Sequence, residues 1–365
     1  MRNLMIGMKN ILFVAVCFTL LLIVGCSDGV TDAGIEDFIW GTSTPGAQGM
    51  DAQMIDSAFI KANQLGYVDC VLIIRNGLIV AEQYYNGYSE STAHNVWSVS
   101  KSFLSATTGI ALNKGHLPGL DKEVLDYFPE YVTPEMDQRK HDIIIEHLLT
   151  MRMGIDGEEA NYIQIYNSDN WIKTTLELPL IFAPGQGYSY NAYVTHVLSG
   201  VITKATGMST REYAELYLTD PMGISIGNWE QDPQGIYFGG NSMHFTPRDM
   251  AVLGYLYLNN GRLNNNQIVP EAWVDFTLTP STSWSPLEWG PMKNYQYGYL
   301  WWLCELKNHD AFLAMGYAGQ LVITIPDLNL IIVTTANSNV ADWDEASVQE
   351  LAILNVIGDY ILESL

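Results

Sequence analysis

The chain has 365 residues, enough for one large domain or for two lobes that share a core. Charged residues make up only 16% and hydrophobic residues 48%, a composition that argues against disorder. The formal net charge is −23 and no basic patch is present, so nucleic acid is not expected as a partner.

The N-terminal residues have the pattern of an export signal. Arg2 and Lys9 give a positive start, and residues 11–24 form an apolar run that is too short to span a bilayer as a helix. Residues 23–26, Ile-Val-Gly-Cys, resemble a bacterial lipobox, in which the cysteine is lipidated and becomes the new N-terminus. An ordinary signal peptide with a chance cysteine at Cys26 is the alternative.

These patterns predict the division of the chain. We expect residues 1–25 to be a lipoprotein signal peptide and residues 26–50 to be a tether rich in small and polar residues. Residues 51–365 would form one domain with a helical lobe at about residues 115–290. The protein is then expected to be an exported bacterial lipoprotein, periplasmic or anchored at the outer membrane or cell surface, and to touch the membrane only through lipid on Cys26.

Predicted strands occur near both ends of this domain, and helices dominate between them. In chain order the predicted elements are a helix at residues 54–65 that stops at Gly66, strands at 70–74 and 78–81 joined by an Asn76-Gly77 turn, a helix at 98–114, helices at 143–151, 193–205, 210–218 and 248–259, strands at 297–304, 321–325 and 330–335, and a helix near 347–362. This order predicts an α+β fold, with an antiparallel sheet built from both termini, flanking terminal helices and an inserted helical lobe.

Two cysteines remain in the predicted domain. Cys70 and Cys304 both lie in apolar, strand-like runs, which favours buried free thiols. A disulfide between them is the alternative in an exported protein.

The first candidate catalytic segment contains Ser98 and Lys101, an S-x-x-K pattern at the start of a predicted helix. Residues three apart on a helix are neighbours, so the amino group can reach the hydroxyl and act as the base that a serine nucleophile needs. The unpaired N–H groups of the helix start favour negative charge near Ser98. A serine N-cap followed by a solvated lysine is the alternative explanation.

Two later segments contain further candidates. Tyr190 lies in a turn-rich stretch after Pro184-Gly185, where a tyrosine can relay protons if a nearby cation lowers its pKa. Gly316 lies in a glycine-containing segment just before the strand at residues 321–325, where backbone N–H groups can stabilise an oxyanion. A core aromatic and a simple glycine turn are the respective alternatives.

The order of these three segments resembles the serine β-lactamase and penicillin-binding superfamily. It is most similar to class C β-lactamase-like esterases, carboxypeptidases and 6-aminohexanoate-oligomer hydrolases. Similarity continues through most of residues 55–365, including segments at 120–130, 145–150, 220–223 and 246–250. The resemblance implies a β-lactamase/transpeptidase-like fold.

The resemblance also implies a role for each matching residue. Ser98 would be acylated, Lys101 would accept its proton, and Tyr190 would relay protons to the leaving group and to water. The backbone N–H groups of Ser98 and Tyr317, next to Gly316, would form the oxyanion hole.

Two departures from the family pattern concern substrate binding. Ala192 stands where the family's Y-x-N motif has asparagine, with Asn191 one position early, and residues 314–316 are Ala-Met-Gly in place of K-[ST]-G. We keep Asn191 and Met315 as candidate substrate-binding residues. β-Lactams and D-Ala peptides carry a carboxylate that meets the missing lysine and hydroxyl, and losing such a contact costs about 1.5–3 kcal/mol.

The predicted activity is therefore hydrolysis of a small-molecule or peptide-like ester or amide, with poor turnover of β-lactams. A D-Ala-D-Ala carboxypeptidase or class C β-lactamase is the alternative enzyme, and a non-catalytic binding or sensor protein on the same fold is the alternative of another class. The seven histidines show no metal-binding spacing, so neither a metal nor a cofactor is expected. No oligomeric state is predicted.

Substitution of Cys26 tests the predicted anchor. Cys26→Ser removes the thiol that would carry the lipid, so incorporation of a radiolabelled fatty acid by producing cells is expected to be lost. Cys17→Ser, a change within the predicted signal, should leave labelling intact. Labelling that persists in Cys26→Ser would contradict the lipoprotein prediction.

Overall fold

The computed structural model describes residues 38–283 and 288–365. The predicted signal peptide and Cys26 lie outside the described residues. Within the described ranges, no helix combines the length and the apolar character that a membrane crossing requires. The described end of the predicted tether contains strand β1 (Gly41–Thr42) and a short 3-10 turn, η1 (Gly46–Gln48).

Across the described ranges, nine strands form one sheet in the order β1-β3-β2-β13-β12-β11-β10-β9-β8. All neighbours are antiparallel except β1 and β3. The strands after β1 are β2 (Val68–Arg75), β3 (Leu78–Tyr84), β8 (Thr282–Ser283), β9 (Met292–Tyr297), β10 (Trp302–Leu306), β11 (His309–Gly316), β12 (Gln320–Ile325) and β13 (Leu330–Ala336). Strand β2 pairs with β13, which confirms the prediction of a sheet built from both ends of the domain.

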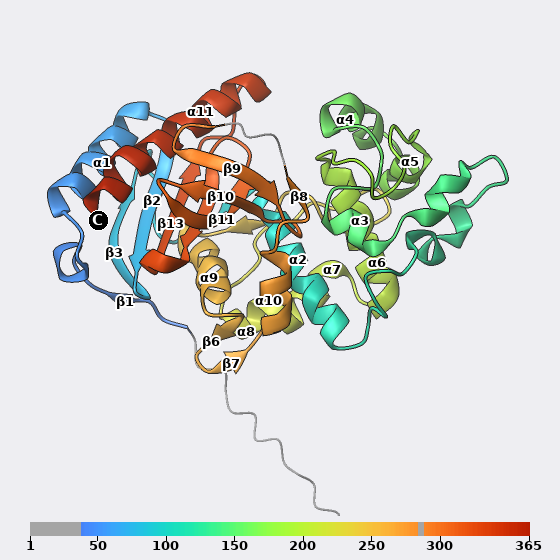
Figure 1. The fold of residues 1–365 in the computed structure, drawn as a ribbon, viewed down its shortest axis with the longest axis horizontal. Helices are drawn as coiled ribbons and strands as arrows, with labels where there is room; N and C mark the ends of the chain where they lie inside the picture. The colour runs from blue at the N-terminus through green and yellow to red at the C-terminus, as the bar shows by residue number, and fades with distance from the viewer. Residues whose placement is uncertain (1–37, 284–287) are drawn as a thin grey trace, which may run out of the picture. The chain divides into compact units, whose positions relative to one another are not determined.

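Helices cover both faces of this sheet and form a separate group beside it (Figure 1). They are α1 (Ala52–Leu65), α2 (Val99–Asn113), α3 (Ile145–Leu149), α4 (Glu158–Tyr166), α5 (Trp171–Glu177), α6 (Ala192–Thr206), α7 (Thr210–Ala214), α8 (Asp220–Met222), α9 (Pro247–Leu258), α10 (Glu271–Thr277) and α11 (Trp343–Val356). Helices α3 to α6, green in Figure 1, belong to the predicted lobe. Two short ladders pair β4 (His94–Asn95) with β5 (His244–Phe245) and β6 (Arg262–Leu263) with β7 (Asn266–Gln267).

The two sheet faces belong to two different cores. Along β2, Val71 and Ile73 pack with the terminal helices α1 and α11, whereas Leu72 and Ile74 pack with the central helices. Because successive side chains of a strand point to opposite faces, a strand buried on both faces is apolar throughout. The continuous apolar runs in the sequence therefore mark the central strands, and the predicted covering by terminal helices is confirmed.

Local sequence signals explain the first elements. Asp51 caps α1 by accepting hydrogen bonds from the N–H groups of Gln53 and Met54, and the helix ends at Gly66 with φ +80°. In the turn between β2 and β3, Asn76 has φ +54° and Gly77 has φ +76°. Positive φ at both positions is what a tight hairpin turn requires, so the predicted hairpin is confirmed.

The predicted strand at residues 297–304 was wrong in its extent. The chain leaves β9 after Tyr297, turns with Leu300 at φ +64°, and enters β10 at Trp302. The carbonyl of Leu300 accepts a hydrogen bond of 2.8 Å from Ser102 of α2. The apolar residues of this turn are buried because the turn itself packs inside the protein, and an apolar run alone does not distinguish that arrangement from a strand.

Residues 314–316 form the end of β11 and precede β12, as expected for a glycine segment before the strand at residues 321–325. Helix α9, which falls within the residue range predicted for the lobe, packs on the sheet: a Cβ on Gly254 would lie within 3.2 Å of side chains of β12 and β13. Cys70 and Cys304 are buried free thiols, as favoured, and burial raises the pKa of both.

Gly109 tests the packing of α2 on α10. An added Cβ there would lie 2.3 Å from the ring of Trp273, and a large ring in a packed core has little room to move. We expect Gly109→Ala to lower the free energy of unfolding by about 1–3 kcal/mol, measured by urea denaturation. The control is Gly46→Ala, because a Cβ at Gly46 meets nothing within 4 Å. Equal stability of the two variants would contradict this packing.

Candidate active site

Ser98 and Lys101 lie at the start of α2, with Ser98 as the N-cap and Lys101 one turn later. Their Oγ and Nζ atoms are hydrogen-bonded at 2.7 Å. Trp97, the residue before Ser98, has φ +49°, a strained conformation for a bulky side chain and one that is characteristic of functional sites. The ladder of β4 with β5 and the hydrogen bond from Val96 N–H to the Met243 carbonyl fix the entry to this turn.

Lys101 is buried, with 1% of its surface exposed. Its Nζ donates a second hydrogen bond of 2.7 Å to the carbonyl of Gly240. Burial lowers the pKa of Lys101 to about 8, while the carboxylate of Glu158 acts in the opposite direction. About a tenth of the amine is then neutral at pH 7, so the group can accept a proton from Ser98 near neutral pH.

Tyr190 is the third residue of the cluster. Its hydroxyl hydrogen-bonds with Ser98, and Nζ of Lys101 lies 4.8 Å from the centre of its ring. The sequence analysis considered a cation that lowers the pKa of this tyrosine, but burial instead raises the pKa of Tyr190 above its usual value. Tyr190 is therefore a protonated phenol at neutral pH, suited to relaying a proton and not to being the resting base.

The end of β11 passes directly beside the turn that carries Ser98. A Cβ on Gly316 would lie 2.3 Å from the carbonyl oxygen of Val96 and 3.2 Å from Cβ of Trp97, so only glycine permits this approach. Within the described residues, the backbone N–H groups of Ser98 and Tyr317 make no hydrogen bond to the protein. They are thus available as the pair of donors that an oxyanion hole requires.

Glu158 lies beside this cluster, and the sequence analysis did not single it out. The side chain is buried, and its Oε2 accepts a 3.0 Å hydrogen bond from the N–H of Ala192. Its own N–H donates to the carbonyl of Tyr190. Burial raises the pKa of Glu158 and the positive charge of Lys101 opposes that rise, so the two buried groups interact electrostatically.

Gly240 was also missed, since nothing in its local sequence marks it. A Cβ on Gly240 would lie 2.4 Å from the carbonyl of Ala192, and one on Gly239 would lie 2.3 Å from that of Thr195. Two consecutive glycines let this segment press against the start of α6 and direct the Gly240 carbonyl at Lys101.

Asn191 has a different position from the one predicted. The side chain is fully buried; its Oδ1 accepts from Tyr193 N–H at 2.9 Å and its Nδ2 donates to the Asp156 carbonyl at 3.1 Å. The structure therefore gives Asn191 the role of capping α6 and fixing the loop before Glu158, in place of the predicted substrate contact.

Aromatic rings surround the cluster on two sides. The Tyr317 ring lies 5.0 Å from Trp97 and 4.7 Å from Trp343, and the Tyr190 ring stacks on Trp302 at 5.7 Å. Met315, at the position of the family's hydroxyl residue, is half-buried. Neither Met315 nor the buried Ala314 offers a charge to a substrate carboxylate.

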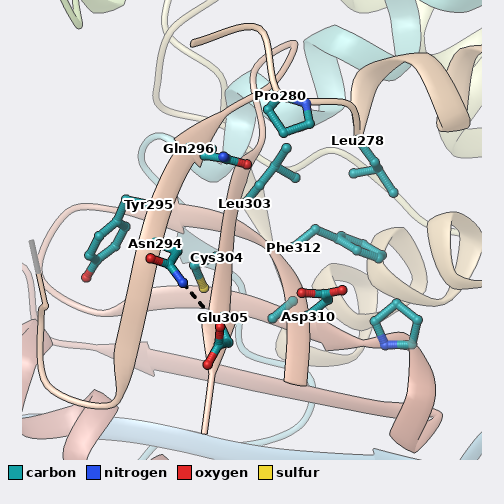
Figure 2. Close-up of a pocket in the computed structure, with 12 residues that line it drawn as sticks. Leu278, Pro280, Asn294, Tyr295, Gln296, Leu303, Cys304, Glu305, Asp310 and Phe312 are labelled. Atoms are coloured by element: carbon teal, nitrogen blue, oxygen red, sulfur yellow. Dashed lines mark hydrogen bonds between the residues drawn. The ribbon is translucent and has the colours of Figure 1, made fainter. Parts of the chain in front are cut away.

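A cavity of about 630 Å³ lies on a different part of the sheet (Figure 2). It is lined by β9, β10, β11 and the segment after α10, and its lining does not include Ser98, Lys101 or Tyr190. Figure 2 shows Leu303 and Phe312 among the side chains that line it. The catalytic candidates therefore come from convergent elements and are not marked by this cavity. Among the described residues, no group of three or more His, Cys, Asp or Glu could hold a metal ion.

A hydroxyl next to a buried amine, a phenol and two free N–H groups is an arrangement suited to acyl transfer. The fold is that of the β-lactamases and transpeptidases. The Beta-lactamase family model matches residues 55–355, and the chain belongs to this family. The family and its relatives are hydrolases of the β-lactamase superfamily.

Three relatives illustrate the range of similarity. A 6-aminohexanoate-dimer hydrolase of Paenarthrobacter ureafaciens is 23% identical over 286 residues, which cover 73% of this chain and 71% of the relative. Esterase EstB of Burkholderia gladioli is 25% identical over 150 residues, 37% of this chain and 38% of the esterase. The solved structure of a putative 6-aminohexanoate-dimer hydrolase from Bacillus anthracis superposes with a TM-score of 0.67 and 21% identity, covering 90% and 89% of the two chains.

Removal of the Glu158 charge tests the electrostatics of the cluster. Because this carboxylate raises the pKa of Lys101, Glu158→Gln should move the rising limb of kcat/KM against pH to lower pH. The glutamine oxygen can still accept from Ala192. The measurement is the pH dependence of hydrolysis of a chromogenic ester. The matched control is the exposed Glu159→Gln, and an unshifted limb in Glu158→Gln would contradict the assignment.

Proposed function

We propose that the protein is a serine hydrolase that cleaves an uncharged ester or amide through an acyl-enzyme on Ser98. The observation that carries the proposal is the 2.7 Å hydrogen bond between Ser98 Oγ and the buried Nζ of Lys101, with Tyr190 bonded to the same hydroxyl. A solvated lysine beside a helix cap, the alternative from sequence, does not account for a lysine with 1% exposure.

In the acylation step, Ser98 Oγ attacks the substrate carbonyl carbon while its proton passes to the neutral Nζ of Lys101. The carbonyl oxygen becomes an oxyanion and accepts hydrogen bonds from the N–H groups of Ser98 and Tyr317. When the bond to the leaving group breaks, Tyr190 donates its phenolic proton to that group and regains one from Lys101. The site then holds an ester of Ser98 and a neutral Lys101.

Deacylation reverses these proton transfers with water as the nucleophile. Water loses a proton through Tyr190 to Lys101 as its oxygen attacks the acyl carbon, and the proton returns to Ser98 Oγ as that oxygen leaves. The pKa directions support this division of labour. Burial lowers the pKa of Lys101 to about 8, within reach of neutral pH, but raises the pKa of Tyr190. The amine therefore holds the proton between steps, and the phenol only transfers it.

The walls of the site favour an uncharged substrate. Ala314 and Met315 replace the lysine and hydroxyl that meet a carboxylate in carboxypeptidases and β-lactamases of the resembled family. The rings of Trp97, Tyr317 and Trp302 offer apolar contact instead. Similarity to an esterase and to a 6-aminohexanoate-dimer hydrolase supports hydrolysis of a non-β-lactam substrate.

The proposal includes the place of action. The pattern of residues 1–26 supports export and a lipid anchor on Cys26, which would hold the domain near a membrane surface. The domain itself would then work on substrates outside the cytoplasm.

Substrate comparison with a nucleophile variant tests the proposed activity. We expect hydrolysis of a short-chain nitrophenyl ester to exceed that of nitrocefin in kcat/KM, because no cationic group replaces the family lysine. Ser98→Ala should lower ester turnover by on the order of 10³-fold or more, and the exposed Ser91→Ala should not. Faster turnover of nitrocefin than of the ester would favour a β-lactamase. No turnover of either substrate would favour a binding protein.

A further inference from the structure

The turn between β11 and β12 presents the Tyr317 N–H to the site, and its backbone is held in an unfavourable conformation. Ala318 has φ +62°, a value uncommon for a residue with a Cβ, and Gly319 has φ +99°. Such a conformation persists only when surrounding contacts enforce it. The contacts that enforce it come largely from the C-terminal helix, α11.

Two consecutive residues of α11 form hydrogen bonds with the backbone of Ala318, one with its N–H and one with its carbonyl. Ala318 N–H donates to Oε1 of Glu350 at 2.7 Å, and the Ala318 carbonyl accepts from Nε2 of Gln349 at 2.7 Å. The same Nε2 donates to the carbonyl of Asn337 at 2.8 Å, so Gln349 also contacts the residue that follows β13. Ala318 and Gln349 are both buried, so water does not compete freely for these groups.

Residues of α11 before and after Gln349 and Glu350 also contact the turn. At the start of the helix, Tyr317 Oη donates to the Asp342 carbonyl at 2.9 Å and its ring packs edge-on against Trp343. Further along, a Cβ on Gly319 would lie 2.3 Å from Cδ1 of Ile353. The turn is therefore seated along three turns of α11.

We propose that α11 is a clamp for the oxyanion hole, with Gln349 and Glu350 as positioning residues that set the direction of the Tyr317 N–H. The proposal rests on the proposed function. The peptide before Tyr317 is fixed by the pairing of Gly316 with Gln320 and by its seat on Val96. That peptide carries the Tyr317 N–H. The next peptide, which carries the Ala318 N–H, is held by Glu350, so Tyr317 is restrained on both sides and rotation that would redirect its N–H is opposed.

Glu350 has a feature that ordinary helix packing does not explain. Its carboxyl is largely removed from water, and this burial raises its pKa to about 7, against the lowering by the Ala318 N–H. A buried carboxylate is costly, and its negative charge disfavours an oxyanion nearby. What Glu350 contributes to the site is a hydrogen-bond acceptor that fixes the position of the Ala318 N–H. The expected consequence is that an uncharged acceptor at position 350 serves as well.

Variants of Gln349 and Glu350 test the clamp in the ester hydrolysis assay. Glu350→Ala removes the acceptor and Gln349→Ala removes the donor, and each should lower kcat by on the order of 10-fold to 100-fold with KM within about 2-fold, since a misdirected oxyanion donor acts on the transition state. Glu350→Gln keeps an oxygen acceptor without the charge and should recover most of the wild-type kcat.

Asp344→Asn is the matched control, because Asp344 is an exposed carboxylate on the first turn of the same helix. It should match the wild type. The clamp is overturned if Glu350→Ala and Gln349→Ala keep the wild-type kcat, if their losses equal the loss of folded protein measured by thermal denaturation, or if Glu350→Gln is as impaired as Glu350→Ala. Gln349→Ala keeps the test valid should Glu350→Ala fail to fold.

The same assay separates this proposal from the proposed function. Loss of turnover in Ser98→Ala together with wild-type kcat in the two alanine variants overturns the clamp alone. Turnover that persists in Ser98→Ala overturns both.

Discussion

Lys101 places an amino group where almost no water reaches it, at hydrogen-bond distance from Ser98, and much of the structure follows from that placement. A buried ammonium is unstable unless neighbouring groups compensate it. The Gly240 carbonyl and Glu158 supply that compensation from two distant parts of the chain. Because the compensation is partial, the pKa of Lys101 falls to about 8, which suits the amine to the role of base that we propose for it.

The sheet supplies the other half of the site and explains why the domain is built from both chain ends. Strand β11 ends at Gly316 against the turn that precedes Ser98, so the helix that carries the proposed nucleophile begins in contact with the strand that leads into the proposed oxyanion donor, Tyr317. Helix α11 then seats the turn after β11. In the proposed mechanism, chemistry on α2 thus depends on a helix that begins about 240 residues later in the chain.

The sequence predicted what depends on short-range rules. Positive φ at Asn76 and Gly77 and the spacing of Ser98 and Lys101 follow from local geometry, and the structure has both. It did not predict what depends on tertiary contacts. In the sequence, Glu158 resembles a solvated acid, but in the fold it is buried. The segment at residues 298–301 resembles a strand in the sequence, but it is a turn whose apolar residues are buried because the turn packs inside the protein.

The central claim is that a covalent acyl group forms on Ser98. Intact-protein mass spectrometry after rapid acid quenching of the protein with a slowly hydrolysed nitrophenyl ester, followed by peptide mapping, tests it most directly. The account predicts one added acyl mass, located on the peptide that contains Ser98 and absent from Ser98→Ala. An acyl mass on another residue, or ester turnover in Ser98→Ala with the same adduct, would contradict it.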